Sequence, residues 1–278
     1  MRHRRVGRVG RLAAAAVLVT VGLGAAACGS GGKSSSAADP WQLVVASPQK
    51  TTDARSANFS INLVTKALGQ SFTLTGTGAF DFAKHAGAIH FTLPASLGGR
   101  TISEIVTTNT LYLQLPPATP PGKYAAIKVS DLTGDGSLAQ LGNSDPTTAL
   151  ETLRGASHDV RKVGTATVRG TQTTHYRGTI DVQAAINAAP EFLREKVRRV
   201  FGRLTSLPYD AYLDDQGRLR RFDQRLTLPA TSDTGNQPVD VTSTFELFDF
   251  GTTVNAAPPP ASKTVDGSSL LQQLMRRS

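Results

Sequence analysis

The sequence predicts an α+β fold in which most of the chain forms one antiparallel β-sheet. Two observations lead to this prediction. Apolar residues recur at every second position in many short segments, as in strands with one buried face. Glycine, proline and aspartate separate these segments closely, so turns join neighbouring strands and the sheet meanders. A few segments show helical spacing instead.

The N-terminus has the layout of an export signal. Five arginines precede an apolar stretch, residues 12–27, that ends in small residues. We therefore assign residues 1–27 to a signal peptide and exclude them from the fold. The stretch is short and rich in alanine and glycine for a transmembrane span, and an uncleaved anchor is the alternative.

Cys28 is the only cysteine of the chain and follows Ala25 and Ala27, small residues that suit a signal peptidase. The stretch resembles a bacterial lipobox, in which the cysteine receives a diacylglyceryl group, although Ala25 stands where leucine is usual. Residues 28–39 continue as a glycine- and serine-rich tether. We expect a lipidated Cys28 and a protein anchored to the outer face of the cell membrane; ordinary cleavage, leaving a free thiol, is the alternative. One cysteine also means that the exported fold has no internal disulfide.

The basic charge belongs largely to the export signal. The formal net charge is +9, and the five arginines of residues 1–27, with no acidic residue beside them, account for five of these charges, which leaves +4. A nucleic-acid-binding protein needs a basic patch interleaved with aromatic residues, and the remaining charges are spread along the chain. We expect no nucleic-acid partner and no cofactor.

The first half of the domain begins with a helix and continues as strands. Asp39 and Pro40 are suited to the N-cap and first turn of a short helix. Alternation then predicts strands whose apolar faces carry Phe59, Ile61 and Leu63; Phe72, Leu74, Phe80 and Phe82; Ile89, Phe91 and Leu93; and Leu111, Leu113 and Leu115.

The second half mixes helices and hairpins. Asp145, Pro146 and Gly155 bound a short helix with Leu150 and Leu153 on one side. A two-residue turn at Arg169 and Gly170 predicts a hairpin that sets Val163 against Tyr176 and His158 against Asp181.

Residues 183–204 are the main helical segment, which Pro190 interrupts. The part after Pro190 is amphipathic and basic; its cationic face is either solvated or lies on anionic head groups. Two strands around a turn at residues 215–217 and a last strand within residues 239–250 follow, and the tail of residues 255–269 is expected to be extended.

The residues that could act in catalysis or metal binding form no strong motif. His158 opposite Asp181 could polarise a hydroxyl, although such cross-strand pairs are more often surface pairs. His85 and His90 fall on opposite faces of a strand, so we expect no metal there. Asp214 and Asp215 suit a hairpin turn better than a calcium loop. We expect a protein that is not an enzyme; an exported hydrolase using His158 and Asp181 is the enzymatic alternative.

Three stretches of the second half form a recognisable series: "LRGASHDVRKVGTATVRGTQTTHYRGTIDV", "LPYDAYLDDQGRLRRF" and "FELFDFGTTVNAAPPP". In order and spacing they resemble the LppX and LprG family of actinobacterial lipoproteins. One departure is Ala211 or Tyr212, where the family commonly has tryptophan. The specific motifs lie mainly after Leu150, and the first half matches in strand pattern only.

The resemblance implies a LolA- and LolB-like half-barrel: one curved antiparallel sheet of about 10 to 11 strands wrapped around helices. It places the domain at residues 40–265 and a C-terminal tail at residues 266–278. It also implies a membrane-anchored monomer that binds the acyl chains of a membrane lipid or acylated glycolipid in an apolar cavity, for transfer or presentation. The alternative is an envelope lipoprotein that acts through protein contacts and has no lipid cavity.

Apolar strand residues and the amphipathic helix supply the expected cavity lining. The predicted lining residues are Phe72, Leu74, Phe80, Phe91, Leu113, Tyr176, Val197, Phe201 and Phe222. The sequence does not distinguish such a cavity from a filled core.

Overall fold

The computed structural model describes residues 38–95, 98–131, 146–191, 194–195, 197–198, 204–228, 230 and 236–275. These residues belong to one compact unit, Ala38–Ser278. The predicted signal peptide, Cys28 and Phe201 lie outside the described residues.

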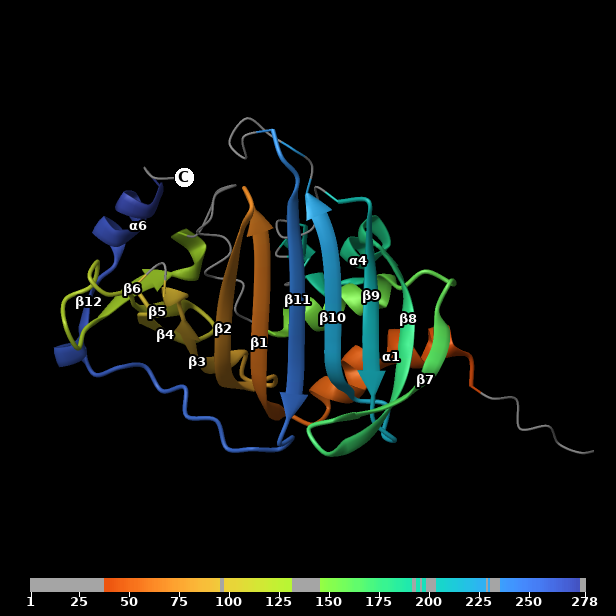
Figure 1. Ribbon diagram of the computed structural model, residues 1–278. Coiled ribbons are helices and arrows are strands. Elements are labelled where there is room, and N and C mark those ends of the chain that lie inside the picture. The colour runs from red at the N-terminus through yellow and green to blue at the C-terminus, as the bar shows by residue number, and fades with distance from the viewer. Residues whose placement is uncertain are drawn as a thin grey trace, which may run out of the picture. The chain divides into compact units, whose positions relative to one another are not determined.

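The described part contains twelve strands in a single sheet, and Figure 1 shows this sheet as a broad curved surface. The strands are β1 Ser56–Ala67, β2 Gln70–Asp81, β3 Ala86–Thr92, β4 Thr101–Val106, β5 Thr110–Gln114, β6 Tyr124–Lys128, β7 Arg161–Val168, β8 Thr171–Asp181, β9 Ser206–Leu213, β10 Leu219–Leu228, β11 Val239–Phe248 and β12 Thr264–Asp266. Their order across the sheet is β12-β6-β5-β4-β3-β2-β1-β11-β10-β9-β8-β7.

The predicted α+β meander is confirmed, since each pair of neighbouring strands is antiparallel except β12 and β6. The parallel strand β12 and the C-terminal helix α6 were not predicted. Strand β12 falls in the stretch expected to be extended, and α6 falls in the predicted C-terminal tail of residues 266–278. Three strand residues and about two helical turns are too short a pattern to recognise.

Helices lie on one face of the sheet, where Figure 1 shows α1 and α4 behind the strands. The helices are α1 Pro40–Thr52, α3 Pro146–Thr152, α4 Val182–Ala188 and α6 Ser268–Met275, and short 3₁₀ turns are η2 Val129–Asp131, η3 Leu153–Gly155 and η5 Ala261–Lys263. The predicted start of α1 is confirmed: the side chain of Asp39 accepts a hydrogen bond from the backbone N–H of Trp41 at 3.1 Å.

Glycines allow aromatic rings to lie flat on the sheet at its centre. Gly78 of β2 lies opposite Phe59 of β1 and Ile89 of β3. A Cβ atom on Gly78 would lie 2.5 Å from the carbonyl oxygen of Ala88 and 2.8 Å from the ring of Phe59. The fully buried ring of Phe59 therefore occupies the space that any side chain at position 78 would need.

The hairpin of β7 and β8 turns where predicted, at Arg169 and Gly170, which both have positive φ. Its register agrees with the prediction from Gly164 to the turn. Beyond that point a bulge at Val163 places Lys162 opposite Tyr176, so the predicted pairing of Val163 with Tyr176 is wrong.

The tip of this hairpin reaches across the sheet, and Figure 1 shows it in green beside the lower end of β11. The Nε–H of Arg169 donates to Glu246 at 2.7 Å and its Nη2–H to Ser60 at 2.9 Å. The guanidinium also lies 4.0 Å from the centre of the Phe248 ring. One arginine thus connects the hairpin to both β11 and β1.

Asp214 organises the turn between β9 and β10, which confirms the expectation of a hairpin turn there. Its carboxylate accepts from the backbone N–H groups of Gln216 and Arg218, and from the side chains of Arg218 and Arg220 at 2.9 Å each. Burial alone would raise the pKa of Asp214, but the hydrogen bonds from Arg218 and Arg220 outweigh it and hold that pKa below its ordinary value of 3.8. Both arginines also lie over the ring of Phe250.

The crowding at Gly78 predicts that Gly78→Ala destabilises the domain by about 1 to 3 kcal/mol, because the added methyl group meets backbone on one side. Gly164→Ala is the matched control, since no atom lies within 4 Å of its added Cβ. Urea unfolding followed by circular dichroism measures both variants. Equal midpoints for the two would contradict this account of the β2 glycines.

The buried turn predicts that Asp214→Asn lowers the free energy of unfolding by about 3 kcal/mol at neutral pH, because two arginines lose their partner. The folded-state pKa of Asp214 is lowered, so its contribution is complete above the unfolded value of 3.8 and is lost as the pH falls through the folded-state pKa. The gap between wild type and variant should therefore close in acid.

Asp215→Asn is the control for this prediction, since the neighbouring Asp215 is exposed. Unfolding curves measured across the acidic range give the difference in the free energy of unfolding between wild type and each variant. A gap that persists unchanged at low pH would show that the charge of Asp214 does not stabilise the turn.

Candidate functional site

The candidate site is the face of the sheet that carries Phe59, Phe80 and Phe222, which we call the inner face. The strand registers define rows of side chains that run across this face. One such row crosses seven strands, from β9 to β4, and consists of Ala211, Phe222, Phe245, Ile61, Gly76, Phe91 and Ile102. Because side chains alternate between the two faces of a strand, this row of apolar and glycine residues crosses seven of the twelve strands on one face.

One part of the inner face is closed by packing. Of the predicted lining residues, Phe80, Tyr176, Val197 and Phe222 lie in a buried cluster with Val44 of α1, Leu150 of α3 and Ile186 of α4. Leu113 lies in a second cluster with Leu270 of α6. These five predicted residues are at most 6% exposed, so side chains of the protein itself fill the space around them.

Another part of the inner face is half-buried. It includes the polar side chains of Thr65, Gln224 and Ser243. Its apolar members begin two residues beyond Ile61 along β1, with Leu63 of β1 opposite Leu74 of β2, and continue with Leu226 of β10, Val241 of β11 and Phe72 of β2. We call these five apolar residues the open track. Phe72 and Leu74 belong to the predicted lining, and the third half-buried member of that set, Phe91, packs against both buried clusters.

The open track ends at an exposed apolar rim. Leu228 of β10, which pairs with Val239 of β11, is 38% exposed. In the adjacent turn between β1 and β2, Leu68 is 58% exposed and has φ of 52°, a backbone conformation that leucine rarely adopts. Exposed apolar side chains therefore lie at this end of the sheet, beside the polar Lys66, Gln70 and Asp240.

A buried acid lies on the inner face and was not predicted. Glu104 of β4 is 1% exposed and sits between Ile89 and Leu113 in the strand registers. The signal was present in the sequence, since Ile102, Glu104 and Val106 share one face of the strand "TISEIV". It is an acidic side chain within an otherwise apolar row.

The structure overturns the predicted pairing of His158 with Asp181. The ring of His158 stacks on Trp41 with centroids 4.1 Å apart, and Trp41 donates its indole N–H to the carbonyl oxygen of Ala156. Asp181 instead caps α4 by accepting from the backbone N–H of Ala184 at 2.8 Å, and it pairs with Ser206 of β9. The hydrolase alternative required His158 beside Asp181, and the structure does not place these two side chains together.

Other polar residues serve structural contacts. His90 lies 3.1 Å from the hydroxyl of Ser103, and no group of three or more metal-ligating side chains occurs among the described residues. On the face of the sheet opposite the inner face, which we call the outer face, Asp210 contacts His175 at 2.6 Å and Arg177 at 2.7 Å. Burial tends to raise the pKa of Asp210, but these two hydrogen bonds outweigh it and lower that pKa.

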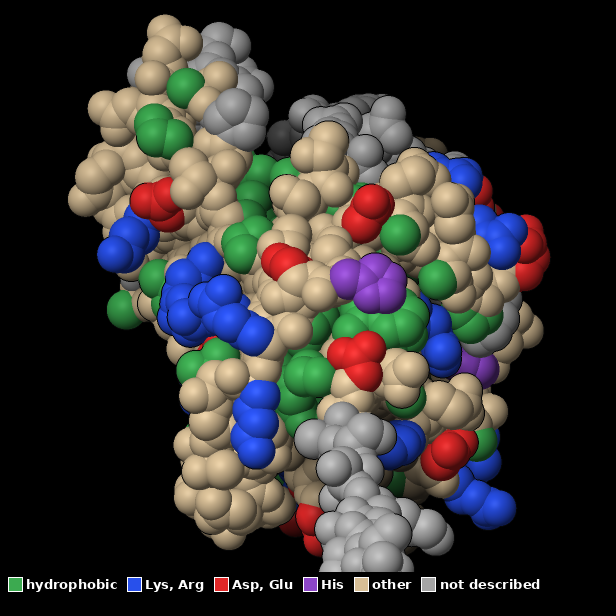
Figure 2. Space-filling view, turned by 90° about the vertical axis from the view of Figure 1, so that its right-hand side faces the viewer, with side chains coloured by type: hydrophobic (Ala, Val, Ile, Leu, Met, Phe, Trp, Pro, Cys, Tyr) green, Lys and Arg blue, Asp and Glu red, His purple; other side chains and the backbone are tan. Residues whose placement is uncertain are grey.

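Charges are interspersed on the side of the domain that Figure 2 shows, where blue and red groups alternate with apolar and uncharged atoms. The described part of the basic helix follows the same pattern: Arg194 pairs with Glu191 and Arg198 with Glu195, while Val197 is buried in the core. Among the described residues, no helix combines the length and the apolar character that a membrane crossing requires.

A pocket of about 910 Å³ lies away from the predicted lining. It is formed by β5, β6 and the arm of residues 259–272, and none of the nine predicted lining residues borders it.

Comparison with known proteins gives partial matches. No family model matches the chain. It is 33% identical over 147 residues to an uncharacterized 31.2 kDa protein of Streptomyces griseus and 31% identical over 152 residues to a Streptomyces coelicolor protein named "putative lipoprotein". The aligned segments cover 51% and 54% of this chain but only 45% and 43% of those two proteins.

Solved structures with a similar fold include LprF from Mycobacterium bovis and the lipoprotein LppX from Mycobacterium tuberculosis. Each has 14% sequence identity and a TM-score of 0.47; the alignments cover 80% and 78% of this chain and 98% and 99% of those chains. Because the identities are below 25% and the TM-scores below 0.5, the description of the fold rests on the strand order and registers above.

Proposed function

We propose that this protein is an exported lipoprotein, anchored to the outer face of the cell membrane through Cys28, that binds the acyl chain of an envelope lipid or glycolipid on the open track. The observation that carries the proposal is the gradient of the inner face. Apolar side chains continue past the packed core as the half-buried Leu63, Phe72 and Leu74 and reach an exposed rim at Leu228.

The anchor is supported from the sequence side. Cys28 follows an export signal and precedes a tether, in a pattern that resembles a lipobox. A Streptomyces coelicolor relative carries the word lipoprotein in its name, and the motifs of the second half resemble the LppX and LprG family. Two or three acyl chains on one cysteine bind a bilayer firmly, whereas a single chain binds only marginally.

The dimensions of the open track suit one acyl chain. From the row of Leu63 to the end of β1 at Ala67 the strands advance four residues, which is about 13 Å. An acyl chain spans half of a hydrocarbon core about 30 Å thick, or about 15 Å. Each methylene buried against the track contributes about 0.8 kcal/mol, so few polar contacts are needed for binding.

The exposed rim is suited to the passage of a chain. An acyl chain that leaves a bilayer avoids water only if apolar surface continues to the point of exit. Leu68 and Leu228 provide such surface at the end of the track.

The alternative is an envelope lipoprotein that acts through protein contacts. The dense packing around Phe80, Leu113, Tyr176, Val197 and Phe222 favours it, because a filled core needs no ligand. The two proposals differ in what occupies the half-buried part of the inner face, and binding experiments separate them.

The anchor predicts that metabolic labelling with an alkynyl fatty acid marks the wild-type protein and that Cys28→Ser abolishes the label, because no other thiol exists in the chain. The variant should also move from the membrane fraction to the soluble fraction.

A Cys28→Ser, Ser34→Cys double variant is the control, since it restores a thiol six residues after position 28. Labelling of the double variant would indicate unspecific acylation of any exposed thiol. A wild-type protein without label, or a labelled Cys28→Ser variant, would overturn the anchor.

The open track predicts that Leu74→Asp weakens the binding of a fluorescent fatty acid by about tenfold or more, because a charge then faces the chain. Thr73→Asp is the matched control: it adds the same charge to the same strand, but its exposed side chain belongs to the outer face. Circular dichroism confirms that both variants fold.

Leu74→Ala provides a second test if the aspartate variant does not fold, with a smaller loss expected. Wild-type protein that takes up no fatty acid, while lipid mass spectrometry of natively extracted protein finds none, would favour the protein-contact alternative. Equal binding by Leu74→Asp and Thr73→Asp would place the lipid elsewhere.

A further inference from the structure

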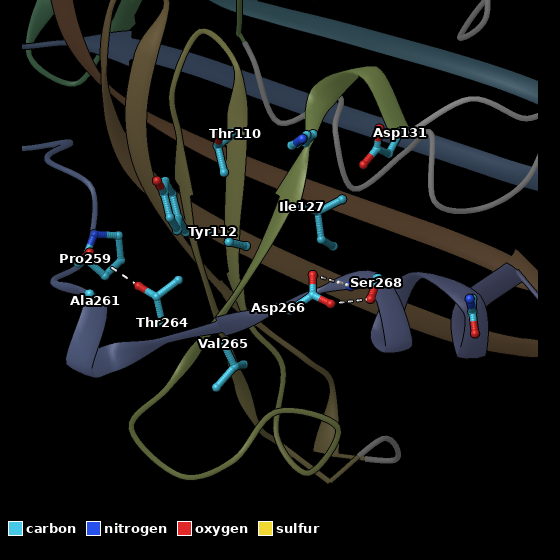
Figure 3. A pocket seen from close by; sticks show the side chains of 13 residues that line it. Thr110, Tyr112, Ile127, Asp131, Pro259, Ala261, Thr264, Val265, Asp266 and Ser268 are labelled. Carbon is cyan, nitrogen blue, oxygen red and sulfur yellow. Dashed lines mark hydrogen bonds between the residues drawn. The ribbon is translucent and has the colours of Figure 1, made fainter.

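The pocket of about 910 Å³ opens between the outer face and the C-terminal arm, as Figure 3 shows. It lies at the β12 edge of the sheet, where Tyr112, Ala126 and Asp266 of the outer face and Ile127 and Val265 of the inner face border it. No residue of the open track lines it, so its ligand is separate from the acyl chain of the proposed function. Strand β12 and the loop before it form one wall, and the outer side chains of β5 and β6 form the floor.

An aromatic ring and a gap beside it form the floor. Tyr112 of β5 pairs with Ala126 of β6, and Ala126 pairs with Asp266 of β12, so the three side chains lie in one row. Tyr112 is half-buried, and its neighbour in the row toward β12, Ala126, carries only a methyl group. Two strand spacings, about 10 Å, separate Tyr112 from Asp266, which is room for a six-membered ring with its substituents.

Hydrogen-bonding groups surround this floor. Figure 3 shows Thr110 on the side of Tyr112, and Asp131, Asp266 and Ser268 on the other side. Asp266 accepts hydrogen bonds from both the hydroxyl and the backbone N–H of Ser268, which lower its pKa and keep it an ionised acceptor. Lys128 and Gln272 add donors to the lining.

These groups select among ligand classes. A phosphate or carboxylate would meet two carboxylates and a single cation, Lys128, and is disfavoured. An acyl chain would leave the polar groups without partners. A neutral sugar suits both the aromatic ring and the polar groups of the pocket. Its C–H face packs on an aromatic ring, while its hydroxyls donate to carboxylates and accept from Lys128 and Gln272.

We propose that this pocket binds a ring of a neutral saccharide against Tyr112. The saccharide can be part of a soluble or polymeric glycan or the head group of a glycolipid, which present the same chemistry. The proposal does not depend on acyl-chain binding, because no residue of the open track lines the pocket.

Saturation-transfer NMR of the folded protein with a panel of methyl glycosides (glucose, galactose, mannose and arabinose) tests the proposal, with millimolar affinity expected for at least one of them. Tyr112→Ala should weaken that affinity by about tenfold. Tyr124→Ala should not, because Tyr124 is an outer-face residue of β6 that does not line the pocket. Ala126→Leu should also abolish binding by filling the gap beside the ring.

Two further arms identify the source of the sugar. Stronger binding of a soluble tetrasaccharide than of the monosaccharide indicates a glycan, whereas recruitment to vesicles containing a digalactosyl lipid, but not to plain phosphatidylcholine vesicles, indicates a head group. No transfer from the whole panel at concentrations near the solubility limit, equal binding by Tyr112→Ala and wild type, or preference for inorganic phosphate would overturn the proposal.

Discussion

The structure depends on one constraint: a twelve-stranded sheet has an apolar inner face that must be covered, and the described helices are small compared with it. At about 4.8 Å per strand the sheet is about 50 Å wide, whereas the thirteen residues of α1 extend about 20 Å. Helices α1, α3 and α4 cover one region and α6 covers another. Between the packed regions and the rim, apolar side chains remain half-buried.

The same constraint explains where stabilising contacts concentrate. The glycines of β2 and β3 let Phe59, Phe80 and Phe91 lie close to the sheet, which compacts its centre without a thick helical layer. Elsewhere the sheet is held by charged groups on turns. Arg169 ties a hairpin tip to β1 and β11, and Asp214 holds the turn beside Phe250. Packing therefore stabilises the centre, and ion pairs stabilise the ends.

Strand alternation and turn chemistry predicted most of the fold, because period-two patterns and capping residues such as Asp39 are local signals. The bulge at Val163 was missed, since one extra residue leaves the alternation of each flank intact. Strand β12 and helix α6 were missed because they are stabilised by contacts with β6 that lie far away in the sequence. For the lining, the sequence predicted only which side chains share the inner face. Alternation identified Phe80 and Phe72 equally well, but the placement of the helices decides that Phe80 is packed and Phe72 is half-buried.

The central claim is that the half-buried part of the inner face, and not the packed part, receives an acyl chain. The most direct measurement is methyl NMR of leucine-labelled protein with a nitroxide-labelled stearate. The account predicts broadening of Leu63, Leu74 and Leu226, while Leu150 and Leu219, which are fully buried in the core, keep their signals. Broadening that is uniform over all leucines, or strongest in the core, would contradict it.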